Sequence, residues 1–154
     1  MNKAIVNNWN EVVAPDDDVY VLGDLMLNNN AEGIKLLQSL NGRLHIVRGN
    51  HDSDARLQLY RECNNVVEIE GAIWLKYNGL HFYLSHYPTL TSNWDYNKPL
   101  KARLINLCGH SHDKDKWSDW DKGLIVHCEL DAWNNRPVLI DTIIKEIKEK
   151  VREN

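Results

Sequence analysis

Four short polar motifs group the side chains of this chain whose types suit metal binding. They are Gly23-Asp24, Gly49-Asn50-His51-Asp52, Ser85-His86-Tyr87-Pro88 and Gly109-His110-Ser111-His112. Imidazole, carboxylate and amide groups together suit borderline to hard divalent ions such as Mn, Fe, Zn or Ni. Two such ions about 3.5–4 Å apart can clamp a phosphoryl group and make hydroxide available near pH 7. The motifs therefore predict a metal site, and phosphoryl transfer is one reaction that such a site could support.

An apolar run comes directly before each motif and is typical of a short strand. These runs cover 19–22, 44–47, 80–85 and 104–108, and the first resembles a strand that is buried on both faces. In open α/β sheets, ligands bind just beyond the carboxyl ends of the strands. If the four strands share a sheet, the motifs meet at one edge of it.

The remaining apolar spacing predicts helices at 2–13, 31–40 and 140–152, and further strands at 66–70, 72–77 and 124–129. Helices and strands alternate in the first half, which indicates parallel pairing with helical crossovers. Asn78-Gly79 predicts a hairpin between two strands of the second half. The expected class is therefore α/β, in a single domain spanning residues 1–154, because this length suits one core.

The composition is that of an ordinary soluble globular protein, with 43% apolar and 26% charged residues. The net charge of −4 does not favour nucleic acid as a partner, because such proteins usually carry a basic excess. No apolar run approaches the roughly 20 residues that span a bilayer, and the first residues do not resemble a signal peptide. Three cysteines without CxxC spacing fit a reducing cytoplasm rather than a disulfide framework.

The order of the four motifs, each after a strand, resembles that of the calcineurin-like metallophosphoesterase family. The stretches 19–24 and 131–138 are most similar to the small single-domain members of bacteria and phages. The resemblance implies a sandwich of two mixed β-sheets flanked by helices. It also implies hydrolysis of a phosphate mono- or diester, such as a nucleotide, by in-line attack of a metal-bound hydroxide.

The resemblance also assigns roles to individual residues. Its metal ligands are Asp24, Asn50, His86, His110 and His112. Asp24 would bridge two ions; Asn50, His86 and His110 would complete the shell of the second ion, and His112 would belong to the first. His51 would be the catalytic residue, stabilising the phosphoryl group or protonating the leaving oxygen, and Asn50 and His51 would face the substrate.

One departure from the family pattern concerns its opening strand, which normally carries Asp-x-His. No such motif occurs in residues 1–23, so the N-terminal strand is expected to be missing. The first ion would keep only Asp24 and His112 as ligands, whereas the second would keep four. The first ion should therefore bind more weakly, and the chain could hold one ion instead of the family's two. The absent strand should expose an edge, which a second copy of the chain in a homo-oligomer could cover.

Two functions from different classes remain open on the sequence. The first is a metal-dependent phosphoesterase acting on a small phosphate ester. The alternative is a catalytically impaired metal-binding remnant that binds a partner or a nucleotide without hydrolysing it.

Overall fold

The structure is a computed structural model that describes residues 3–25, 30–89, 91, 98–110, 115–118 and 124–153. Its helices are Lys3–Val12 (α1), Asn30–Gln38 (α2), Asp54–Arg61 (α3) and Ile140–Glu153 (α4). Its strands are Asp18–Val21 (β1), Arg43–Val47 (β2), Val66–Glu70 (β3), Ile73–Tyr77 (β4), Leu80–Ser85 (β5), Leu104–Cys108 (β6), Trp117–Ser118 (β7) and Ile125–His127 (β8). Every helix and strand expected from the sequence is present.

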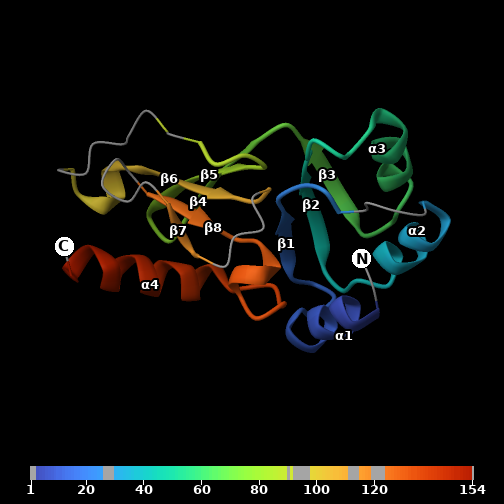
Figure 1. Ribbon diagram of the computed structural model, residues 1–154, viewed down its shortest axis with the longest axis horizontal. Helices are drawn as coiled ribbons and strands as arrows, with labels where there is room; N and C mark the ends of the chain where they lie inside the picture. Colours follow the sequence, from blue (N-terminus) through green and yellow to red (C-terminus); the bar gives the residue numbers. More distant parts are fainter. Residues whose placement is uncertain are drawn as a thin grey trace.

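The strands form two sheets with helices around them (Figure 1). The first sheet has the order β1-β2-β3, and all its pairs are parallel. The second has the order β4-β5-β6-β8-β7; it is mixed, with parallel pairs in the middle and an antiparallel pair at each edge. The predicted α/β class, with two sheets flanked by helices, is confirmed.

The four strands that precede the polar motifs do not share one sheet, so the motifs do not meet at the edge of a single sheet. β1 and β2 belong to the first sheet, whereas β5 and β6 belong to the second. The carboxyl ends of the two pairs nevertheless meet, because the ring of His86 after β5 lies 2.8 Å from the carbonyl oxygen of Leu22 after β1. The motifs are therefore brought together at the junction of two sheets.

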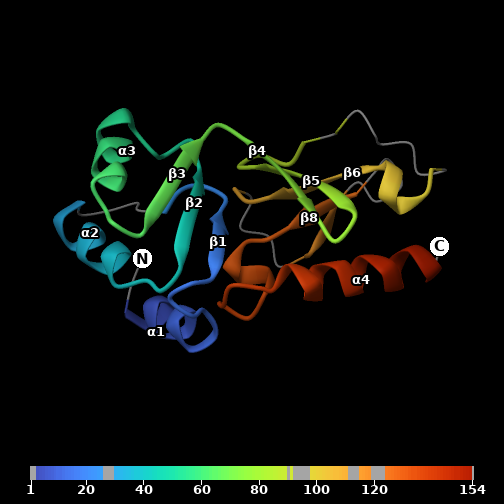
Figure 2. The same cartoon turned by 180° about the vertical axis from the view of Figure 1, so that it is seen from behind.

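Helices α1, α2 and α3 cover one face of the first sheet (Figure 2). Successive strand residues point to opposite faces, so Leu44 and Ile46 of β2 are buried against these helices. The indole of Trp9 on α1 is buried in the same cluster, and its Nε1 donates to the carbonyl oxygen of Asn41 at 2.9 Å. This packing holds β1 and β2, and hence the loops that follow them.

A second apolar cluster lies between α4 and the second sheet and reaches the opposite face of the first. Val47 of β2 is fully buried in it, and Tyr20 and Leu22 pack against it. Its main members on α4 are Ile143, Ile144 and Ile147. Neither α4 nor any other described helix has both the length and the apolar character to cross a membrane.

One α-helix and one strand lie where the apolar pattern predicts none. Helix α3 has a largely polar sequence and is defined instead by its cap, in which the Ser53 hydroxyl accepts from the backbone N of Arg56, and by its buried Leu57 and Tyr60. β7 has only two residues, too few to show any periodicity.

β1 is half-buried rather than buried on both faces. In the described part of the chain it pairs on one side only, with β2, so its other edge has no strand partner there.

None of the three cysteines forms a disulfide bond, and two of them, Cys63 and Cys108, are buried. Burial of the Cys128 thiol, helped by the nearby negative charge of Glu129, raises its pKa to about 12. The neutral thiol is thus the stable form of this side chain in the folded protein.

A first prediction concerns the packing of α4. Ile147 is fully buried, so Ile147→Ala should lower the free energy of unfolding by about 2–5 kcal/mol, through lost apolar contact and the cavity left behind. Leu139, just before the helix, is 69% exposed, and Leu139→Ala should change stability by less than about 0.5 kcal/mol. Urea unfolding followed by circular dichroism measures both, and equal losses would contradict this packing.

A second prediction concerns thiol reactivity. At pH 8 a thiol of pKa about 12 is ionised to roughly 1 part in 10⁴, against about one quarter for an ordinary cysteine. Iodoacetamide should therefore modify Cys128 in the folded protein on the order of 10³-fold more slowly than in the urea-unfolded chain, since the thiolate is the reactive species. Peptide mass spectrometry gives both rates, and similar rates would show that the thiol is not protected.

Candidate metal site at the strand ends

The loop after β1 bends sharply and presents Asp24. Gly23 has φ 98° and Asp24 has φ 53°, both in the left-handed region, which Asp tolerates better than most side chains. A Cβ added at Gly23 would lie 2.5 Å from Nδ1 of His86, and one added at Gly49 would lie 2.3 Å from Oδ1 of Asp24. Only glycine at these two positions lets the loops after β1, β2 and β5 approach so closely.

His86, directly after β5, is 4% exposed and occupies the centre of the site. Its Nδ1 lies 2.8 Å from the carbonyl oxygen of Leu22, which can only accept a hydrogen bond. Nδ1 therefore carries the hydrogen, and in the neutral ring Nε2 presents a lone pair. This contact fixes the orientation of the imidazole as well as its tautomer.

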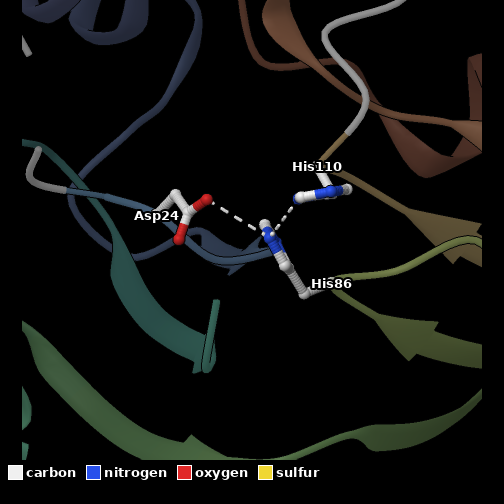
Figure 3. A group of neighbouring side chains, drawn as sticks. All are labelled: Asp24, His86 and His110. Atoms are coloured by element: carbon white, nitrogen blue, oxygen red, sulfur yellow. Dashed lines mark hydrogen bonds and ion pairs between the residues drawn. The ribbon is translucent and has the colours of Figure 1, made fainter. Parts of the chain in front are cut away.

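Three other side chains converge on Nε2 of His86. Its distances are 2.8 Å to Oδ1 of Asn50, 3.1 Å to Nδ1 of His110 and 3.2 Å to Oδ2 of Asp24. Figure 3 shows Asp24 and His110 directed at the ring from two different loops. One ligand atom from each of Asp24, His86 and His110 lies within 4.8 Å of the others.

This arrangement fits a divalent cation. The oxygens of Asp24 and Asn50 both accept, so they face the lone pair of His86 without a hydrogen between them. A proton on Nε2 could form a hydrogen bond to only one of these oxygens. A cation, in contrast, could bind both oxygens and Nε2 at the same time. Mixed nitrogen and oxygen donors suit the borderline to hard metals named above.

His110 and His51 differ from His86 in their exposure to solvent. His110 has φ 73° and an exposed side chain, with its ring edge-on to His86 at a centroid distance of 4.9 Å. The His51 side chain is also exposed, and its backbone N donates to Oδ1 of Asp24 at 2.8 Å. The remaining candidate, His112, lies outside the described residues.

Asp52 proves to be the residue that joins the loops, a role that the sequence pattern does not reveal. Its carboxylate is buried, with the residue 1% exposed, and Oδ2 accepts from the backbone N of Asp24 at 2.9 Å and of Gly49 at 2.8 Å. Its Oδ1 accepts from the hydroxyl of Tyr60 on α3 at 2.9 Å. The signal that could have pointed to this role is Ser53, whose capping position predicts a helix that carries Tyr60 inward.

The sequence has relatives among known proteins. The uncharacterized protein MJ1445 of Methanocaldococcus jannaschii is 33% identical over 153 residues, which cover 96% of this chain and 76% of that protein. The Gene 66 protein of Mycobacterium phage L5 is 26% identical over 151 residues, covering 81% of this chain and 70% of that protein.

Two solved structures are similar in fold. The crystal structure of AQ665 from Aquifex aeolicus, a protein of unknown function, has a TM-score of 0.67 at 23% identity and covers 92% of this chain and 82% of its own. The structure of a novel archaeal phosphodiesterase has a TM-score of 0.53 at 19% identity, covering 80% of this chain and 72% of its own. The family model of the calcineurin-like phosphoesterase superfamily domain matches residues 1–127. This match, over more than half of the chain, shows that it belongs to the calcineurin-like phosphoesterase superfamily.

Proposed function

We propose that this protein hydrolyses phosphate esters with a divalent metal ion held by Asp24, Asn50, His86 and His110. One observation carries the proposal, namely the convergence of Oδ1 of Asn50, Nδ1 of His110 and Oδ2 of Asp24 within 2.8–3.2 Å of Nε2 of His86. Membership in the calcineurin-like phosphoesterase superfamily supports the same reaction class.

A bound divalent ion supplies positive charge that attracts phosphoryl oxygens and lowers the pKa of water. Asp24, Asn50, His86 and His110 would together hold this ion. Asp24 contributes the negative charge, and its Oδ1 is held by the backbone N of His51 while Oδ2 lies toward His86. By family resemblance, His112 together with Asp24 would hold a second ion.

His51 is the proposed catalytic residue because it is next to Asn50 in the chain and its side chain is exposed beside the cluster. As the bond from phosphorus to the leaving oxygen breaks, His51 would donate a proton to that oxygen or stabilise the charge on the phosphoryl group. Asp52 acts indirectly, because its hydrogen bonds to the backbones of Asp24 and Gly49 keep both loops in place.

The proposed substrate is a small phosphate mono- or diester rather than long nucleic acid. The net charge of −4 disfavours a polyanion, while a single phosphate group can be attracted by the local charge of a bound ion.

The metal assignment predicts the effect of Asp24→Asn. Asparagine tolerates the left-handed backbone of this position but removes the negative charge, so the affinity for Mn²⁺ should fall at least about tenfold. Isothermal titration calorimetry with Mn²⁺ measures this, and Asp18→Asn, on an exposed part of β1, serves as the control. Unchanged affinity in Asp24→Asn would show that the ion is bound elsewhere.

The catalytic assignment predicts the effect of His51→Ala. Turnover of p-nitrophenyl phosphate and bis(p-nitrophenyl) phosphate should fall about 10²–10⁴-fold, because a general acid is lost, while bound metal is retained. Elemental analysis and steady-state kinetics give the two quantities, and His81→Gln, on β5 away from the cluster, is the matched control. Loss of metal together with turnover would indicate a ligand role for His51 instead.

A further inference from the structure

We propose that Tyr87 is the base-recognition residue of this site and that the substrate is a nucleoside phosphate whose base stacks on its ring. This inference rests on the proposed function, because the phosphate of the same molecule would lie at the metal cluster. It selects the nucleotide among the phosphate esters considered above, and it gives Tyr87, which lies within the third polar motif, a role in substrate specificity.

The first observation is the position of the Tyr87 ring. Its centroid lies 5.1 Å from that of His86 and 4.6 Å from that of His110, at interplanar angles of 67° and 61°. The tyrosine is nonetheless 50% exposed. An aromatic surface thus borders the solvent side of the cluster, next to the exposed His110.

The second observation is the rigidity of the backbone that carries this ring. The carbonyl oxygen of Tyr87 accepts from the Ser85 hydroxyl at 2.7 Å and from the Thr89 hydroxyl at 2.9 Å. Pro88 disfavours the helical region for the backbone of Tyr87. The exposed side chain is therefore displayed from a fixed turn.

Asn106 on β6 holds that turn in place through hydrogen bonds. It is fully buried, its Oδ1 accepts from the backbone N of Thr89 at 2.9 Å, and its Nδ2 donates to the Ser85 hydroxyl at 2.8 Å. Ordering the ring in advance reduces the entropy lost when a ligand binds to it. A ring held in place by a buried polar side chain and left half exposed is suited to contact a ligand.

The chemistry of the ring selects the ligand. A nucleobase is flat and has a π-face that stacks on tyrosine whatever its hydrogen-bonding pattern, and loss of such a stack weakens binding roughly 5- to 100-fold. A sugar phosphate without a base offers no such surface. The ring should therefore distinguish a nucleotide from its sugar phosphate while leaving the metal in place.

The test compares adenosine 5′-monophosphate with ribose 5-phosphate as ligands of the Mn²⁺-loaded protein, by isothermal titration calorimetry. Every protein in the comparison carries His51→Ala, which keeps the metal but slows hydrolysis of the ligand. Tyr87→Leu should weaken binding of the nucleotide roughly 5- to 100-fold, change binding of ribose 5-phosphate less than about twofold, and retain the Mn²⁺ content. Tyr87→Phe should bind the nucleotide as the unsubstituted protein does, because the hydroxyl is not needed for stacking. Tyr77→Leu removes another exposed tyrosine, at the opposite end of the β4–β5 hairpin, and is the matched control.

Each other result overturns the inference in a distinguishable way. Equal loss of both ligands, or loss of Mn²⁺, in Tyr87→Leu would mean that the ring supports the metal site rather than a base. Equal losses in Tyr87→Phe and Tyr87→Leu would assign the role to the hydroxyl. If ribose 5-phosphate binds and the affinity for the nucleotide does not depend on Tyr87, only the base-stacking role is wrong. If neither ligand binds the Mn²⁺-loaded protein, both the base-stacking role and the proposed function are wrong.

Discussion

The hydrogen bond between Nδ1 of His86 and the carbonyl oxygen of Leu22 is the contact on which the site depends. It joins the loop after β5 in the second sheet to the loop after β1 in the first, and it turns Nε2 toward the other candidate ligands. Without this contact the imidazole could adopt either tautomer and a range of orientations. A backbone carbonyl thus decides which ring nitrogen is available to a metal ion.

Residues at this junction have backbone conformations and a buried charge that would be unfavourable without the surrounding structure. Asp24 and His110 both have positive φ, and the carboxylate of Asp52 is buried. Strained backbone persists where the surrounding structure fixes it, and a buried carboxylate is tolerated when hydrogen bonds satisfy it. Asp52 accepts three hydrogen bonds from three segments, so it stabilises the loop conformations that bring the ligands together.

The two apolar cores explain why the junction is stable enough to carry these features. One core fastens the first sheet to α1, α2 and α3, and the other joins the second sheet to α4 and includes Val47 of the first sheet. The loops that carry the site therefore project from strands that are packed on both sides of the junction. An exposed aromatic such as Tyr87 can be displayed here without loosening its turn, because Asn106 anchors that turn to β6.

Much of this protein follows from local sequence. The 3.6-residue spacing on α1 and α4 and the apolar runs before each motif predict their helices and strands, because burial of one face is encoded in periodicity. The residue types Asp24, Asn50, His86 and His110 similarly indicate metal chemistry, since few other roles use that combination. By contrast, polar α3 and the two-residue β7 have no periodic signal and form through a cap or through pairing with a strand already in place.

Tertiary structure alone decided the rest. That β1 and β2 belong to a different sheet from β5 and β6 depends on pairing between distant segments, which no local pattern specifies. The roles of Asp52 and Tyr87 likewise arise from neighbours supplied by other loops and strands. Local sequence determines which backbone and side-chain groups are available, but the distances between them depend on how the two cores pack, and those distances set the chemistry.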